Sequence, residues 1–276
     1  MNRSPIGIFD SGIGGLTVAR AVFESLPDES IIYFGDTARV PYGPKSPETV
    51  RRYSLEILEW LLGQEVKAVV IACNTSTAHA LQALQEHSPV PVIGVIEPGA
   101  QAAAAATRGG PVGVIGTAGT ISSNAYARAI LRARPGTVVE QRACPLLVPL
   151  VEEGWFEHPA SVLIAREYLE PLRDAGVDTL VLGCTHYPLL KPLIQDVMGP
   201  NVRLIDSGEE TAAEVEAALR SAGLEAPTGA SPRHRFAVSD DEARFRLIGS
   251  RFIGDRLGRA EVVSVGRSSG ASAVIK

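Results

Sequence analysis

The sequence contains few of the residues on which several large classes of protein depend. Among its 276 residues there are three cysteines, Cys73, Cys144 and Cys184. They are odd in number and far apart, so they do not predict a disulfide framework. No C-x-x-C pair is present to hold a structural zinc ion, and we expect no metal site. Free thiols of this kind fit a reducing compartment, and we therefore expect a cytoplasmic protein.

Long apolar runs are missing as well. No stretch of about 18 or more apolar residues is present, so we predict no membrane span and no membrane partner. The N-terminus, MNRSPIGIFDSG, reaches a polar, glycine-rich turn too early for a secretory signal. The net charge of −5 argues against a nucleic-acid-binding protein, which usually carries a basic patch.

Lysine is the scarcest of the charged residues. There are four, Lys45, Lys67, Lys191 and Lys276, and none follows a predicted strand in a setting that suggests a reactive site. A pyridoxal phosphate enzyme needs a lysine to form its Schiff base. We therefore expect chemistry that needs no cofactor.

Short apolar runs alternate with helix-like segments through most of the chain. Runs that are apolar on nearly every residue are typical of strands buried on both faces, as in parallel sheets. Their alternation with helices predicts doubly wound α/β layers, in which ligands bind beyond the carboxyl ends of the strands. The predicted strands are 6–9, 30–36, 68–73, 90–96, 112–116, 137–144, 179–184 and 202–206.

The two halves of the chain resemble each other. IGIFDSGIGGLTVARAV and VGVIGTAGTISSNAYARAI share a strand, a glycine-rich turn and a helix, and VVIACNTSTAHAL matches LVLGCTHYPLL. A duplication predicts two similar α/β domains related by a pseudo-twofold axis, with Cys73 and Cys184 on opposite walls of one cleft. The alternative, that all strand–turn–helix units look alike, stays open at this point.

The chain after residue 207 has a different pattern. A long helix is predicted over 209–223, followed by a loop rich in Pro, Gly and Ser over 226–232. The stretch RFAVSDDEARFRLIGSRFIG then predicts a short strand and a helix. The final stretch, GRSSGASAVIK, is expected to be frayed.

Two of the cysteines occupy matching places at strand ends. Cys73 and Cys184 each follow an apolar run, and a threonine comes soon after each, Thr75 after Asn74 and Thr185 directly after Cys184. A thiol at the start of a helix lies near the positive end of the helix dipole, which predicts a lowered thiol pKa and a reactive thiolate. Free cysteine is also a common core residue, and that is our interpretation of Cys144.

Polar residues near the strand ends provide candidate partners for the thiols. Asp10 follows the first strand, beside a G-x-G-G turn that is not a phosphate-binding fingerprint, and a capping aspartate is the rival interpretation. Asp36 ends the second strand, ahead of a loop with Tyr42 and Gly43. His186 lies two residues after Cys184 and can act as a base or pair with the thiol. Glu152 or Glu153 could support His186, and spacing alone does not separate the two.

Two opposed thiols suit one kind of reaction in particular. Inverting a stereocentre requires a base on one face of a carbon and an acid on the other, because a single group tends to return the proton to the side it came from. Each thiol must alternate between thiolate and thiol. The residues thus favour a two-base proton transfer.

Seven stretches together resemble the glutamate racemases of the cofactor-independent aspartate/glutamate racemase superfamily. The resemblance covers roughly residues 4 to 210 and departs at Ser76, where the family more often has alanine. It implies two α/β domains with the site between them, here 1–97 plus 208–276 and 98–207. The stretches are FDSGIGGLTV, YFGDTARVPYG, ACNTSTAHAL, GTAGTISSNAY, CPLLVPLVEEG, GCTHYPLL and IDSGEETA.

The resemblance also implies a function: interconversion of L- and D-glutamate, which supplies D-glutamate for peptidoglycan, cell-wall biogenesis and cell shape. It implies that Cys73 deprotonates D-glutamate with the help of Asp10. Cys184 would deprotonate L-glutamate with the help of His186 and Glu152. Asp36 is similar to a further supporting carboxylate. A homodimer is common in the family. The residues implied to bind substrate are Asp10, Ser11, Tyr42, Gly43, Asn74, Thr75, Thr117, Thr185 and His186.

Several rival functions are compatible with parts of the pattern. A related racemase could act on aspartate, and assaying both acids separates the two. A two-domain binding protein without chemistry would tolerate loss of both cysteines. A thiol oxidoreductase is disfavoured because no resolving cysteine lies nearby in sequence. Binding to DNA gyrase has been proposed for some family members, but no surface for it is identifiable in this sequence.

Overall fold

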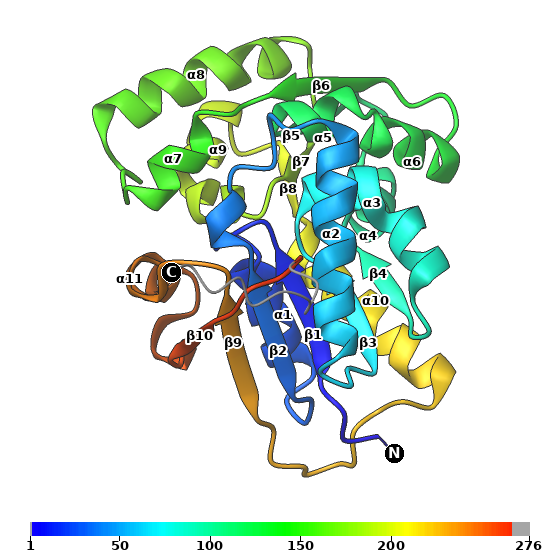
Figure 1. The fold of residues 1–276 in the computed structure, drawn as a ribbon. Helices are drawn as coiled ribbons and strands as arrows, with labels where there is room; N and C mark the ends of the chain where they lie inside the picture. Colours follow the sequence, from blue (N-terminus) through cyan, green and yellow to red (C-terminus); the bar gives the residue numbers. More distant parts are fainter. Residues whose placement is uncertain (1, 267–276) are drawn as a thin grey trace.

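The computed structural model describes residues 2–266, so the prediction about the terminal stretch falls almost wholly outside the described residues. Within this range the chain forms two parallel β-sheets, drawn one above the other in Figure 1. The first sheet has the strand order β10-β9-β2-β1-β3-β4, and all neighbouring strands are parallel. Its strands are β1 (Ile6–Asp10), β2 (Ile31–Gly35), β3 (Ala68–Ile71), β4 (Val92–Gly94), β9 (His234–Val238) and β10 (Ala260–Val262).

The second sheet repeats the arrangement of the first. Its order, β6-β5-β7-β8, is the same as the order β2-β1-β3-β4 in the first sheet, and its strands are also parallel. The prediction of two similar α/β units is confirmed by this shared topology. The strands are β5 (Val112–Gly116), β6 (Val139–Ala143), β7 (Thr179–Gly183) and β8 (Arg203–Asp206).

Helices cover both faces of each sheet. In the first sheet, α1, α10 and α11 pack on one face and α2 and α3 on the other; α4 and α6 cover one face of the second sheet, and α7, α8 and α9 the opposite face (Figure 1). The longer helices are α1 (Leu16–Ser25), α2 (Pro47–Leu62), α3 (Asn74–His87), α4 (Ile96–Ala106), α6 (Ala125–Ala133), α8 (Pro159–Asp174), α9 (Lys191–Met198), α10 (Ser207–Ala222) and α11 (Glu242–Ile253). The short ones are η1 (Thr37–Arg39), α5 (Ala118–Ser122), α7 (Leu147–Glu152), η2 (Tyr187–Leu190) and η3 (Gly254–Arg256).

Alternating side chains explain why the central strands are apolar throughout. Ile8 of β1 faces the core under α1, while its neighbour Phe9 faces the core under α2. The second sheet follows the same rule, with Val114 and Ile115 on opposite faces. Because side chains alternate along a strand, a strand covered on both sides needs apolar residues at every position.

The C-terminal segment returns to the first sheet. Strand β9 pairs with β2, and β10 extends the sheet beyond β9. The strand and helix predicted over 235–254 are confirmed as β9 and α11, whereas β10 was not predicted. The boundaries at residues 97 and 207 stay a prediction. Within residues 2–266, no helix is long and apolar enough to cross a membrane.

Candidate active site

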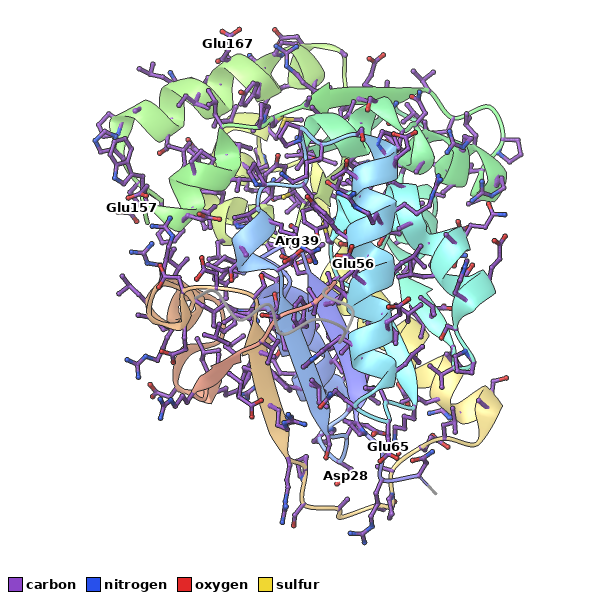
Figure 2. All side chains as sticks on the ribbon, in the orientation of Figure 1. Asp28, Arg39, Glu56, Glu65, Glu157 and Glu167 are labelled. Atoms are coloured by element: carbon purple, nitrogen blue, oxygen red, sulfur yellow. The ribbon has the colours of Figure 1, made fainter. Side chains whose placement is uncertain are left out.

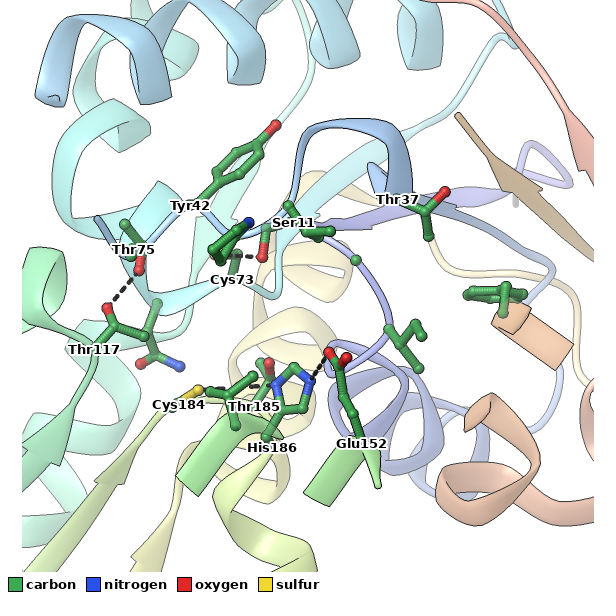
Figure 3. A pocket seen from close by; sticks show the side chains of 18 of the residues that line it. Ser11, Thr37, Tyr42, Cys73, Thr75, Thr117, Glu152, Cys184, Thr185 and His186 are labelled. Atoms are coloured by element: carbon green, nitrogen blue, oxygen red, sulfur yellow. Dashed lines mark hydrogen bonds and ion pairs between the residues drawn. The ribbon is translucent and has the colours of Figure 1, made fainter. Parts of the chain in front are cut away.

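A cavity of about 230 Å³ lies where the carboxyl ends of the two sheets meet (Figure 3). Cys73 follows the end of β3 and Cys184 follows the end of β7. The two thiols therefore line the same cavity from different sheets. Asp10 and Asp36 lie behind the walls. The predicted site residues that line the cavity are Ser11, Tyr42, Gly43, Cys73, Asn74, Thr75, Thr117, Glu152, Cys184, Thr185 and His186.

Cys73 forms the N-cap of α3. Its backbone is extended, the helix begins at Asn74, and the sulfur accepts a hydrogen bond from the backbone N–H of Ser76 at 3.4 Å. The thiol donates to Ser11 Oγ at 3.6 Å. The predicted position at a helix N-terminus is therefore confirmed, and it fixes the direction of the thiol.

The predicted lowering of the Cys73 pKa is wrong for the protein alone. The residue is only 5% exposed. Burial raises the pKa of Cys73 to about 11, and the negative charge of Asp10 adds to the rise. Desolvation disfavours the thiolate more than the helix N-terminus favours it. Cys144 lies in the hydrophobic core, as predicted, and burial raises its pKa to about 12.

Asp10 lies behind the cavity wall and contacts both the turn after β1 and the segment that carries Cys184. One carboxylate oxygen accepts from the backbone N–H of Gly12 at 2.9 Å, and the other accepts from Thr185 Oγ1 at 3.4 Å. Burial raises the pKa of Asp10, although the nearby His186 and the backbone donors oppose the rise. The carboxylate thus orders the turn after β1 and the residue after Cys184 at once.

Cys184, His186 and Glu152 form a continuous row (Figure 3). His186 Nδ1 lies 3.9 Å from Cys184 Sγ, and His186 Nε2 lies 3.2 Å from Glu152 Oε1. Glu153 is exposed, so the structure selects Glu152 as the partner that spacing could not. Burial lowers the pKa of His186, but its contacts with Cys184 and Glu152 outweigh burial and raise it to about 10. The hydrogen bond with His186 lowers the pKa of Glu152.

The glycine-rich turn after β1 packs directly against the Cys184 turn. A Cβ atom on Gly14 would overlap Thr185 Oγ1 and the ring of His186. Thr17 Oγ1, at the start of α1, also donates to the backbone carbonyl of Thr185 at 3.1 Å. Glycine at position 14 therefore allows the turn after β1 to pack directly against Thr185 and His186.

Hydroxyl and amide groups line the wall between Cys73 and the second sheet. Thr75 Oγ1 lies 2.8 Å from Thr117 Oγ1, and both contact Thr120 Oγ1. Asn74 Oδ1 accepts from Tyr126 Oη at 2.7 Å, which turns the amide nitrogen away from Tyr126. That nitrogen is buried and has no hydrogen-bond partner among the described residues. It is a free donor suited to a carboxylate.

Asp36 supports the loop that carries Tyr42 and Gly43. Its buried carboxylate accepts from Tyr42 Oη, from Ser239 Oγ at 2.8 Å and from Arg39 Nε at 2.7 Å. Arg39 also pairs with Glu56 of α2, and Figure 2 shows the two side chains close together. Asp36 therefore contacts the loop and not the cavity.

Gly43 makes contact across the two sheets. Its carbonyl accepts from the backbone N–H of Gly119 at 2.9 Å, and a Cβ on Gly43 would lie 2.8 Å from Thr117 Cβ. The backbone at Gly43 therefore packs closely against the second unit, and it also lines the cavity.

Some cavity residues were not predicted from the sequence. The C-terminal segment returns to the first sheet at β9 (Figure 1), and residues at the start of α11 line the cavity. Gly12, Thr37 and Pro41 are next in sequence to the predicted Ser11, Asp36 and Tyr42, and this adjacency was the available signal. The cavity residues that were not predicted are Gly12, Ile13, Thr37, Val40, Pro41, Val148, Asp240, Asp241, Arg244 and Phe245.

Two parallel α/β sheets that share a four-strand order, with a thiol from each at one cavity, define a class of two-unit α/β proteins with a cysteine on each side of the site. Within residues 2–266, no group of three or more His, Cys, Asp or Glu residues is arranged to hold a metal ion.

Comparison with known proteins gives the family. A sequence model of the Asp/Glu/Hydantoin racemase family matches residues 14–215. Glutamate racemase from Geobacter metallireducens is 58% identical over 260 residues, which cover 94% of this chain and 96% of that protein. The chain therefore belongs to the Asp/Glu/Hydantoin racemase family, in its glutamate racemase branch. The prediction of an isomerase of this kind is confirmed.

Solved structures agree with the assignment. A glutamate racemase isoform from Bacillus anthracis superimposes with a TM-score of 0.92 at 43% identity, covering 96% of this chain and 98% of that one. Glutamate racemase from Francisella tularensis, solved in complex with D-glutamate, gives a TM-score of 0.89 at 40% identity, with the same coverage. The predicted fold class is confirmed by these similarities.

Proposed function

We propose that this enzyme interconverts L- and D-glutamate by moving the α-proton between Cys73 and Cys184. The observation that carries the proposal is that one buried thiol from each sheet lines a single cavity. The family membership and the D-glutamate complex of the Francisella tularensis relative support glutamate as the substrate.

The proposed proton transfer is balanced and involves no change of oxidation state. One cysteine, as thiolate, takes the α-proton, and the electron pair of the broken C–H bond stays on the α-carbon. The other cysteine, as thiol, gives its proton to the opposite face of that carbon. Cys73 is assigned to D-glutamate and Cys184 to L-glutamate on the family resemblance. At the end of a turnover the two sulfurs have exchanged protonation states.

Different groups assist the two thiols. Protonated His186 can donate from Nδ1 to the thiolate of Cys184, while Glu152 holds the opposite edge of the ring. Cys73 has Asp10 nearby, and the substrate ammonium group would bring a positive charge to this side. Because an opposite charge within about 4–6 Å favours an ionised group, substrate binding would lower the pKa of Cys73 from about 11.

We assign substrate binding to neutral donors. The free amide nitrogen of Asn74 and the hydroxyls of Thr75 and Thr117 can hold one carboxylate, and the donors near Ser11 and Thr185 the other. Donors on the α-carboxylate stabilise the negative charge that develops when the proton leaves. Asp36 is assigned a supporting role through its hydrogen bond with Tyr42.

The family resemblance supports four wider proposals. The enzyme supplies D-glutamate for peptidoglycan and so for cell-wall biogenesis and cell shape. It works in the cytoplasm, where thiols stay reduced. It forms a homodimer. Its first domain comprises residues 1–97 and 208–276, and its second comprises residues 98–207.

Racemase assays with both candidate acids test the proposal. Circular dichroism should record racemisation of L- and D-glutamate without added cofactor, and little or no turnover of aspartate. Cys73→Ser and Cys184→Ser should each lower the turnover number at least about 100-fold, because general acid–base groups contribute factors of this size. Cys144→Ser, which alters a core thiol, is the matched control. Preferred turnover of aspartate, or full activity in either site variant, would contradict the proposal.

A further inference from the structure

Arg244 brings a positive charge to the cavity from the C-terminal segment. It lies in the first turn of α11, its side chain is 54% exposed, and it is the only lysine or arginine among the described residues that line the cavity. Its Nη2 lies 3.4 Å from Glu152 Oε2. The guanidinium therefore faces the far oxygen of the carboxylate that holds His186.

The Glu152 carboxylate is shared between two cations on different elements. Oε1 lies 3.2 Å from His186 Nε2, and Oε2 faces Arg244. A second arginine of α11, Arg251, donates to the backbone carbonyl of Glu152. Helix α11 thus holds both the backbone and the side chain of Glu152, and a row of contacts runs from Arg244 through Glu152 and His186 to Cys184.

We propose that Arg244 is a positioning residue for proton transfer at Cys184, which fixes Glu152 so that His186 keeps its orientation toward the thiol. The proposal rests on the proposed racemase function and goes beyond it by assigning a role to the returning C-terminal segment. Arg244 contacts neither sulfur, so it acts through Glu152. It also makes the geometry on the Cys184 side depend on the contacts of α11 with Glu152.

The charges around Glu152 support a positioning role. His186 and Arg244 both lower the pKa of Glu152 and so favour its ionised form, and Asp240 and Asp241 line the same cavity. A carboxylate held at both oxygens has a fixed plane, whereas one held at a single oxygen can rotate. Without Arg244, the hydrogen bond between Glu152 and His186 should become less well defined.

Kinetics of substituted enzymes test the proposal. Arg244→Met should lower the turnover number about threefold to tenfold with the KM changed less than about twofold, because a half-exposed ion pair contributes modestly. Arg244→Lys should restore most of the loss. The matched control is Arg246→Met, which removes an exposed arginine of the same helix that pairs with Glu242 at 3.9 Å. Arg246→Met should behave as wild type.

The effect should be confined to the Cys184 side. In Arg244→Met, the primary isotope effect with α-deuterated L-glutamate should increase and that with α-deuterated D-glutamate should decrease, because proton removal by Cys184 becomes more rate-limiting. In a Glu152→Gln background, Arg244→Met should add no further loss. Equal isotope effects in both directions, or additive losses in the double variant, would contradict the role.

A spectroscopic measurement separates this proposal from the racemase function. In wild type, Arg246→Met and Arg244→Lys, the His186 Nε2–H should give a slowly exchanging NMR signal, because Glu152 accepts its hydrogen bond. In Arg244→Met, its exchange should be roughly tenfold faster. Unchanged exchange in Arg244→Met overturns the positioning role whether or not the enzyme turns over glutamate. Absence of glutamate turnover in wild type overturns the function alone.

Discussion

At the residue scale, the two thiols are alike in type but differ in their surroundings. Cys73 is hydrogen-bonded to Ser11 and lies near a carboxylate, whereas Cys184 lies beside an imidazole. A nearby anion disfavours a thiolate and a nearby cation favours it. In the protein alone, the Cys73 thiol therefore depends on the positive charge that a substrate brings, whereas the Cys184 thiol already has His186 beside it.

The pKa of His186, about 10, predicts a measurable titration. Its NMR signals should show a protonated ring through neutral pH, and Glu152→Gln should lower the pKa because the carboxylate that favours the charged ring is lost. Because the folded pKa is raised above the ordinary value of 6.5, the resulting stability is fully present below about pH 6.5 and is lost as pH rises toward 10.

The control for this titration is Glu153→Gln, which removes the exposed neighbouring carboxylate and should leave the pKa of His186 unchanged. A His186 ring that titrates near its ordinary pKa in wild type, or that responds equally to both substitutions, would show that the pair with Glu152 does not hold its charge.

Residue-scale prediction from the sequence succeeded where a local pattern was enough. Cys73 and Cys184 stood out because each ended an apolar run and had a threonine within the next two residues. The sign of the Cys73 pKa shift was missed, because burial depends on tertiary packing and outweighs the helix end. Glu152 and Glu153 could not be separated, since only the position of His186 in space selects one. Arg244 lacked any local signal.

At the element scale, the turn after β1 explains why this segment is rich in glycine. The turn must reach Thr185 and His186 while α1 starts directly behind it, with Thr17 bound to the backbone of Thr185. A side chain on Gly14 would separate the two units at the site. The strand–helix pattern predicted this element, but its contact with the second unit follows only from the folded arrangement.

Gly14→Ala should therefore impair the enzyme strongly. We expect a loss of activity of at least about tenfold and a decrease in the free energy of unfolding of about 1–3 kcal/mol, because an added methyl group in a closely packed site forces displacement of its neighbours. Urea unfolding and racemase assays measure the two effects.

Gly258→Ala is the matched substitution, because its Cβ would meet Phe236 only at 3.7 Å, an ordinary contact distance. It should have little effect on activity or stability. If Gly14→Ala is equally harmless, the close approach at Thr185 and His186 does not constrain the site.

At the scale of the whole molecule, each of the two similar units supplies one thiol, and the C-terminal segment returns to line the same cavity. The shared strand order of the two sheets brings the ends of β3 and β7 to one cavity, and β9 with α11 adds a further wall. The sequence allowed the duplication to be predicted, because apolar runs and turns recur at similar spacing. The additional wall could not be predicted, since it depends on where β9 joins the first sheet.

The most direct test of the central claim is proton exchange in deuterated water, starting separately from L- and D-glutamate and stopped early in the reaction. With two opposed thiols, each product molecule should carry deuterium at the α-carbon, while the remaining substrate keeps its original hydrogen. Equal deuterium in product and remaining substrate would indicate a single base that serves both faces, and would contradict the assignment of Cys73 and Cys184 as two opposed acid/base groups.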